Sequence, residues 1–254
     1  MIYVNRKSYP YMEEVNEGIL KQFERLAPLT GRVLDVGCGR AALGFAIRQL
    51  GWEVWGVEQS DEACPTAAKR VHTLIEADLH DYDGVGNKLG ETRFDALVFS
   101  DVLEHVYDPR TVLEKYLEFV KPGGKVLISV PNAVVWTNRL SLMFGRVEYT
   151  DTGVMDRTHI RFFTFRTAKR LATAAGLTLD RVASTPYLAR ALLPLLKSRL
   201  SRGNSDAAPD CRALIDSSGY KNYMKWVYPV EHAVASLWRG MFAFRIIVVA
   251  TKPA

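Results

Sequence analysis

Two carboxylates and two imidazoles occur at spacings that could carry acid–base or metal chemistry. Asp101, Glu104 and His105 lie within one turn of chain, and His159 comes from a later segment. Such groups can take a proton from a reacting hydroxyl, and they are also ligands for divalent ions. The plainer alternative is that Glu104 caps a helix start and His105 packs in the interior, since histidines without a chemical role are common. These four residues are the candidates for catalysis.

A glycine-rich turn is the first sign of a ligand site. The run from Val33 to Gly39 reads Val-Leu-Asp-Val-Gly-Cys-Gly, so Asp35, Gly37 and Gly39 lie between an apolar strand and a helix. Glycine lets the backbone approach a ligand closely, and the helix that follows offers free N–H groups. A Gly-x-Gly alone is a weak signal, because tight packing also explains it.

Polar residues at the ends of the next strands strengthen this signal. Glu58 ends the second expected strand, where a carboxylate can accept both hydroxyl hydrogens of a ribose. Asp78 and Leu79 follow the third, placed to receive an adenine amine and to pack on its ring, and Ser100 ends the fourth. Because these positions share one edge of a parallel sheet, the pattern predicts a nucleoside-type cofactor.

A nicotinamide dehydrogenase would use the same kind of sheet and an acid at the same place. Its pyrophosphate motif requires a third glycine, however, where this chain has Ala42. Asp35 would also repel a diphosphate, whereas a zwitterionic amino acid tolerates it. The sequence therefore disfavours a dinucleotide.

The elements that must position these residues follow a βαβ rhythm from Arg32 onward. We expect strands over 33–36, 53–58, 73–76, 94–100, 125–130, 177–182 and 244–251. Helices are expected over 41–50, 61–70 (capped by Ser60 or Asp61), from Pro109 onward and over 167–175. The glycines at 84, 86 and 90 indicate a polar loop. Residues 131–161 lack a long periodic segment and have the composition of a substrate loop, with Trp136, Tyr149, Asp151, Asp156 and His159.

The composition is that of one soluble globular domain, with 48% hydrophobic and 24% charged residues among 254. No apolar run is long enough to span a membrane and the first seven residues do not resemble a signal peptide, so a cytoplasmic protein is expected. The three cysteines, Cys38, Cys64 and Cys211, show no metal-ligand spacing and are expected to be free thiols.

The net charge of +5 is concentrated near the end of the chain. Between residues 186 and 245, nine Lys or Arg face four acids, interleaved with Leu and Trp. This pattern argues against nucleic acid, which needs a continuous basic strip. Over 187–240 it is typical either of helices packed over an active site or of a peripheral contact with an anionic membrane, and a homodimer interface is a third reading.

The motifs together resemble the class I S-adenosylmethionine (SAM) methyltransferases. The resemblance covers residues 32–179 and the last strand, and it includes the glycine turn, Glu58, Ala77-Asp-Leu79, Asp101-Val-Leu-Glu-His105 and Lys121-Pro-Gly-Gly124. It implies that Gly37 and Gly39 bracket the methionine part of SAM, that Glu58 holds the ribose, and that Asp78 and Leu79 hold adenine. The family usually has a glycine where this chain has Ala41, whose methyl group is expected to narrow the cleft slightly.

Two finer resemblances concern the methyl acceptor. Residues 149–164 look like bacterial methyltransferases of sugar, cell-surface polysaccharide and secondary-metabolite pathways, whose usual acceptor is a hydroxyl. The Asp-x-x-Glu-His spacing with a distant histidine resembles ubiquinone-type and small-RNA ribose O-methyltransferases, in which Glu-x-x-Glu-His residues bind a magnesium-class ion. If such an ion binds here, Asp101, Glu104, His105 and His159 are its ligands. Otherwise His159 or His105 is the general base.

These observations predict an α/β, doubly wound (Rossmann-like) sheet of seven mostly parallel strands, with the last strand antiparallel and a helical insertion before it. We expect one domain: an N-terminal helical cover (1–30), a core (31–185), a helical lid (186–240) and the last strand (241–254). The predicted activity is SAM-dependent O-methylation of a hydroxyl on a sugar, secondary metabolite or lipid-linked intermediate. The alternatives are N-methylation of an amino sugar or small amine and a non-catalytic SAM-binding partner protein.

Overall fold

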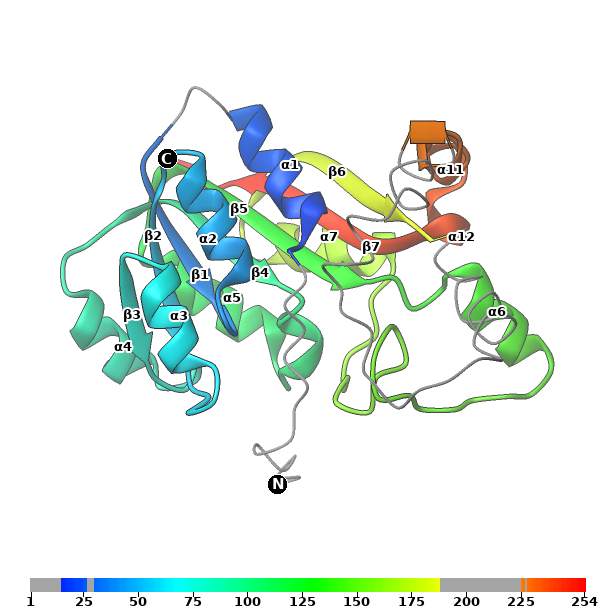
Figure 1. The fold of residues 1–254 in the computed structure, drawn as a ribbon, viewed down its shortest axis with the longest axis horizontal. Helices are drawn as coiled ribbons and strands as arrows, with labels where there is room; N and C mark the ends of the chain where they lie inside the picture. Colours follow the sequence, from blue (N-terminus) through cyan, green and yellow to red (C-terminus); the bar gives the residue numbers. More distant parts are fainter. Residues whose placement is uncertain (1–14, 27–29, 188–224, 227) are drawn as a thin grey trace, which may run out of the picture.

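The computed structural model describes residues 15–26, 30–187, 225–226 and 228–254. Its centre is one seven-stranded sheet of order β3-β2-β1-β4-β5-β7-β6, in which β7 runs antiparallel to both of its neighbours (Figure 1). The strands are β1 (Arg32–Val36), β2 (Glu53–Glu58), β3 (Thr73–Glu76), β4 (Phe94–Ser100), β5 (Val120–Pro131), β6 (Thr178–Pro186) and β7 (Ala243–Thr251). The predicted doubly wound α/β fold with an antiparallel last strand is confirmed.

Helices cover both faces of this sheet. One face carries α1 (Glu17–Leu26), α2 (Ala42–Gln49) and α3 (Cys64–Arg70), and the other carries α4 (Tyr82–Leu89), α5 (Pro109–Leu117) and α7 (Phe165–Ala174). Side chains alternate between the two faces along each strand, so each strand contributes to both cores. In β4, Ala96 and Val98 pack on the face of α1, α2 and α3, whereas Leu97 and Phe99 pack on the face of α4, α5 and α7. Because both faces are buried, the central strands are nearly continuous apolar runs, interrupted by Asp35 in β1 and Asp95 in β4.

The described part of the expected insertion before the last strand is helical. Here α11 (Tyr228–Leu237) and α12 (Arg239–Phe242) precede β7, and the Tyr187 ring stacks on Phe244 with 4.8 Å between ring centroids. Residues 188–224, which hold most of the expected lid and membrane contact, lie outside the described residues. The lid, the membrane contact and the homodimer remain predictions.

Two local expectations were wrong, and one segment contains a short helix that was not predicted. The glycine-containing loop at 82–89 is helix α4, which Asp81 caps by accepting the Gly84 N–H, and which buries Val85 and Leu89. Residues 131–161 contain helix α6 (Trp136–Met143). Helix α3 begins later than expected, after Ala63, and has no side-chain cap at that position, although Ser60 Oγ accepts the Ala63 N–H at 3.3 Å.

The N-terminal helix belongs to the core of the first face. Its Ile19 and Phe23 are buried beside α2, and Phe23 meets Trp52 edge to face with 5.2 Å between ring centroids. Residues 1–14 lie outside the described residues, so a cover over the cofactor remains a prediction. Cys38 and Cys64 form no disulfide within the described residues, and Cys211 falls outside them, so three free thiols remain a prediction. Among the described helices, none has the length and apolar character needed to cross a bilayer.

Candidate active site

The glycine turn lies at the carboxyl end of β1, against the end of β2. The N–H groups of Gly37 and Cys38 both donate to the Val57 carbonyl, at 2.8 and 3.1 Å. Gly37 and Gly39 have φ values of 68° and 55°, in the left-handed region where glycine carries no steric penalty. The sequence therefore needs glycine at both positions to make this turn.

Glu58 holds the turn in shape. Its carboxylate accepts the backbone N–H of Gly39 at 2.8 Å and those of Gln59 and Ser60 at 2.9 Å each. The side chain is almost fully buried. Glu58 thus links the ends of β1 and β2, and its carboxylate stands at the position where the family resemblance places the cofactor ribose.

The turn ends at Ala41, which corrects one expectation. Ala41 has φ 54°, in the left-handed region, which costs about 1–2 kcal/mol for a residue with a Cβ atom. This strain accounts for the glycine usual in the family. Its methyl group is fully buried in the first-face core, so it does not narrow the cleft.

Asp35 is a buried acid directly before the turn. Burial, with a further contribution from the negative charge of Glu58, raises the pKa of Asp35 to about 7. SAM carries a positive sulfonium and an α-ammonium group, which favour an ionised carboxylate nearby. The paired acids Asp35 and Glu58 therefore fit a cationic amino-acid ligand better than a diphosphate.

We expect SAM binding to weaken as the pH falls through 7. Protonated Asp35 must lose its proton when the cation binds, so affinity should drop about tenfold between pH 8 and pH 6. Calorimetry across this range measures the effect, and Asp35→Asn is the control in which the dependence should largely disappear. A wild-type profile that is flat, or that matches the variant, would contradict this role for Asp35.

The other cofactor candidates lie at the ends of β3 and β4, as predicted. Asp78 Oδ1 accepts the His80 N–H at 3.0 Å, and Leu79 packs against the second-face core. Ser100 Oγ accepts a hydrogen bond from Asn16 at 3.1 Å. Their contact with a cofactor remains a prediction.

The segment that carries His159 is fastened to the turn after β4. The Glu104 carbonyl accepts the N–H groups of both Ile160 and Arg161 at 3.0 Å. The guanidinium of Arg161 donates to the Tyr107 carbonyl and also lies over the Tyr107 ring. These contacts bring His159 beside Glu104 and His105, so three of the four catalytic candidates form one cluster.

Glu104 is the most unusual member of the cluster. It lies on a short 3₁₀ turn, η1 (Leu103–His105), and is 0% exposed. Neither carboxylate oxygen accepts a hydrogen bond from any described residue, and Oε1 lies 3.9 Å from His159 Nε2. Burial, followed by the charge of Asp101, raises the pKa of Glu104 well above its usual range. The side chain is not the helix cap that the plainer alternative requires.

The two imidazoles are oriented by backbone carbonyls. His105 Nδ1 lies 3.2 Å from the Thr158 carbonyl and His159 Nδ1 lies 3.0 Å from the Val154 carbonyl, which places the Nδ1 proton of each ring on that side. The rings meet edge to face with 4.7 Å between centroids. Burial, then the neighbouring His159, lowers the pKa of His105 to about 4, so this ring is neutral at pH 7. Metal-binding histidines commonly show this arrangement.

The ligand atoms of Glu104, His105 and His159 all lie within 4.8 Å of one another. The Asp101 carboxylate is not among these atoms, although its charge acts on Glu104. It pairs with Arg245 Nε at 2.7 Å and accepts the Ser129 hydroxyl at 2.8 Å. The spacing predicted four groups at one centre, and the structure brings together three.

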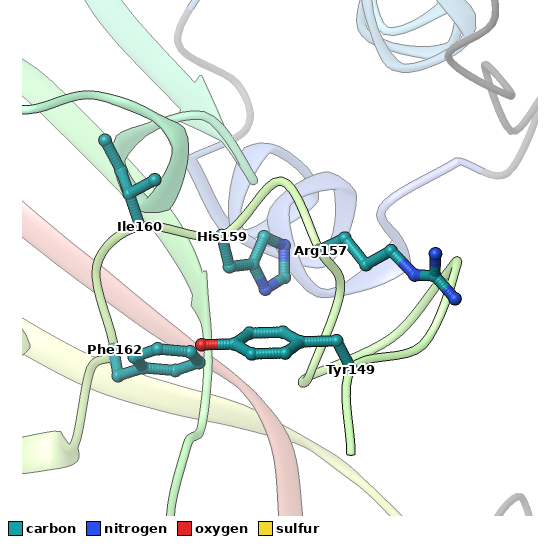
Figure 2. A pocket seen from close by; sticks show the side chains of 5 residues that line it. All are labelled: Tyr149, Arg157, His159, Ile160 and Phe162. Atoms are coloured by element: carbon teal, nitrogen blue, oxygen red, sulfur yellow. The ribbon is translucent and has the colours of Figure 1, made fainter. Parts of the chain in front are cut away.

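A pocket of about 600 Å³ opens beside the cluster (Figure 2). Its lining residues are Tyr149, Arg157, His159, Ile160 and Phe162. Tyr149 lies across the pocket with its hydroxyl end toward Phe162, and Arg157 is directed away from His159. Because His159 belongs to both the pocket wall and the cluster, an occupant of the pocket lies next to the ionisable groups. The predicted substrate loop therefore lines a pocket, with Tyr149 and His159 among its members.

Sequence reasoning missed Asn16, Ser129 and Arg245, which surround Asp101. Asn16 Nδ2 donates to Ser129 Oγ at 2.9 Å and approaches Asp101 Oδ2 at 3.5 Å. One available signal was Arg245 itself, a single charge in the otherwise apolar last strand. Nothing in the sequence marks Asn16, which lies more than 80 residues from Asp101.

The sheet order, the glycine turn and the acid at the end of β2 define a class I methyltransferase. The chain belongs to the methyltransferase domain family, whose model matches residues 11–182, and it is a SAM-dependent enzyme. It is 33% identical over 185 residues to a ubiquinone biosynthesis O-methyltransferase of Paraburkholderia phymatum, a match that covers 69% of this chain and 77% of that relative.

Two solved structures share the fold. One is a SAM-dependent methyltransferase from Archaeoglobus fulgidus, with a TM-score of 0.57, 17% identity, and coverage of 93% of this chain and 94% of that one. The other is the magnesium protoporphyrin IX methyltransferase of Synechocystis PCC 6803 with bound SAH, with a TM-score of 0.55, 14% identity, and coverage of 93% and 81%. At these identities the likeness concerns the fold.

Proposed function

We propose that this chain transfers the methyl group of SAM to a hydroxyl oxygen of a small, largely apolar acceptor, with Glu104, His105 and His159 holding a divalent ion next to that oxygen. The observation that carries the proposal is the buried Glu104 carboxylate, which accepts no hydrogen bond from a described residue and faces His159. An unpaired buried carboxyl group is costly unless a cation or a donor joins it.

The three side chains fit a divalent ion. Carboxylate oxygen and imidazole nitrogen are both metal ligands, and the three ligand atoms lie within 4.8 Å of one another. The Thr158 and Val154 carbonyls accept the Nδ1 protons of His105 and His159. Nε2 is therefore the nitrogen of each ring that carries the lone pair and can act as a ligand. An ion bound here would supply positive charge that lowers the pKa of a neighbouring hydroxyl.

In the reaction, the bond between sulfur and methyl carbon breaks and a bond between oxygen and that carbon forms. The electron pair of the broken bond stays on sulfur, giving S-adenosylhomocysteine, and the hydroxyl proton leaves to a base or to water. The protein mainly aligns the two partners. Without an ion, His159 is the stronger general-base candidate, because a pKa of about 4 makes His105 a weak base.

The pocket favours an apolar, ring-bearing acceptor over a sugar. Three of its five lining residues, Tyr149, Ile160 and Phe162, present apolar surface on which a ring can pack, and Arg157 and His159 add polar groups that can hold its hydroxyl, whereas a sugar needs a denser set of hydrogen-bonding groups. The names of several relatives assign them O-methylation in ubiquinone biosynthesis, which supports oxygen as the acceptor atom. A secondary metabolite and the head of a lipid-linked intermediate both fit this description.

The test presents the enzyme with SAM and one of three probes: 4-propylcatechol, methyl glucoside or 4-propylbenzylamine. We expect a methyl ether of the catechol by mass spectrometry, formed much more slowly after chelation and restored by added divalent ion. Methylation of the amine alone would support N-methylation instead. Catechol methylation that chelation does not affect would remove the ion and leave His159 as the base.

A further inference from the structure

The backbone conformation of Asp101 and its hydrogen-bond partners keep its carboxylate outside the cluster of Glu104, His105 and His159. Asp101 is a non-glycine residue with φ 56°, in the left-handed region, which costs up to about 1–2 kcal/mol for a residue with a Cβ atom and less for Asp and Asn than for most others. Strain of this kind persists only where surrounding contacts enforce it. The contacts here are Arg245, Ser129 and Asn16, which come from β7, from β5 and from the residue before α1.

Arg245 is the strongest of these partners. Its Nε donates to Asp101 Oδ2 at 2.7 Å, while the Ser129 hydroxyl donates to the other oxygen, Oδ1, at 2.8 Å. The pair is largely buried, with side-chain exposures of 15% for Arg245 and 26% for Asp101. A charge-assisted bond in such a place is short and strong. Both carboxylate oxygens are therefore engaged by groups outside the cluster.

The remaining ligands differ in kind from those of a magnesium site. Glu104 offers oxygen, whereas His105 and His159 offer nitrogen. Magnesium prefers oxygen ligands in a regular octahedron, whereas imidazole suits zinc, iron, cobalt and nickel. Without the Asp101 oxygen, two of the three protein ligands are nitrogen atoms.

We infer that Arg245 withholds Asp101 from the cation site, so that Glu104, His105 and His159 form a three-ligand site that selects a transition-metal ion over Mg²⁺. The inference rests on the proposed function, because it requires that a cation bind. It departs from the expectation of a magnesium-class ion with four protein ligands. With three protein ligands, a bound ion would have room for a further ligand, as in catalytic metal sites.

The experiment measures metal binding directly, with no acceptor present. Purified protein is stripped with chelator and titrated with Co²⁺, followed by visible absorption, and with Mg²⁺, followed by calorimetry. We expect a Kd for Co²⁺ at least about tenfold below that for Mg²⁺. Glu104→Gln should weaken Co²⁺ binding about 10–100-fold. Asp101→Asn, which tolerates a positive φ and keeps a hydrogen-bonding group, should change the Co²⁺ Kd less than about threefold.

Two further variants test Arg245 as a positioning residue. Arg245→Met releases Asp101, so we expect Mg²⁺ to bind more tightly and the preference for Co²⁺ to narrow, while Arg245→Lys should restore the wild-type ratio. The control is Asp180→Asn. It removes a separate ion pair, between Asp180 and Lys125, and so measures the effect of losing an ion pair elsewhere in the fold.

The outcomes separate the inference from the proposed function. If Asp101→Asn weakens Co²⁺ binding as much as Glu104→Gln does, Asp101 is a ligand and the inference is wrong, although the cation site stands. The inference is also wrong, and the cation site again stands, if Mg²⁺ binds as tightly as Co²⁺ or if Arg245→Met leaves the ratio of the two Kd values unchanged. If the wild-type protein binds neither ion, the cation is lost from the proposed function and the inference fails with it.

Discussion

His159→Ala is expected to lower turnover by about 10²–10⁴-fold while leaving the Kd for SAM within about twofold of the wild-type value. The side chain belongs both to the ionisable cluster and to the wall of the pocket, so its loss removes a group at the acceptor. The cofactor turn at Gly37 and Glu58 is built from other segments of the chain. Single-turnover kinetics and calorimetry measure the two quantities separately.

The control for this variant is Tyr107→Ala, in the turn that anchors the His159 segment. Tyr107 is 80% exposed; the substitution removes the ring under the Arg161 guanidinium, but it keeps the backbone carbonyl to which Arg161 donates, and the Glu104 carbonyl still accepts the N–H groups of Ile160 and Arg161. We expect nearly normal turnover there. Equal losses of turnover and SAM affinity in His159→Ala would place the residue at the cofactor instead, and thermal unfolding of both variants shows whether the fold is retained.

The sequence predicted the sheet well because each strand has a strong local signature. Both faces of β4 are covered, so its run from Phe94 to Phe99 is almost entirely apolar, and the parallel order follows from the alternation with helices. Helix α4 was missed because glycines at 84 and 86 disfavour a helix locally. Burial of Val85 and Leu89 and the cap at Asp81 outweigh that preference.

The cluster was predicted in part, and the limit has a physical cause. Local spacing places Glu104 and His105 together on one turn, and the composition of the loop marked His159 as a candidate. Spacing cannot show that a residue from a distant strand binds one of these groups. Arg245 lies 144 residues from Asp101 and forms an ion pair with its carboxylate. The long-range contacts of the fold, rather than the motif, decide which groups share a site.

Cofactor binding is expected to depend on the glycine turn more than on any other feature. Gly37→Val should weaken SAM binding by at least about 100-fold, because a β-branched residue at φ 68° is a true outlier and the turn must rearrange. A Cβ atom at this position would lie 2.8 Å from Val102 Cγ2, so the new side chain has no room on that side. Glu58→Ala should cost about 1.5–3 kcal/mol of SAM binding, which corresponds to roughly 10–100-fold in Kd.

The chain supplies a matched control for the backbone strain at Gly37. Gly123 has a similar φ of 78°, a Cβ atom added there would meet nothing within 4 Å, and the residue lies near the start of β5, away from the turn. Gly123→Ala should therefore reduce the free energy of unfolding through φ strain alone and leave SAM affinity unchanged, whereas Gly37→Ala should reduce both. Chemical denaturation and calorimetry on these variants separate stability from binding. Unchanged SAM affinity in both Gly37→Val and Glu58→Ala would remove the glycine turn from the cofactor site, because neither the backbone approach at Gly37 nor the carboxylate at Glu58 would then contribute to binding.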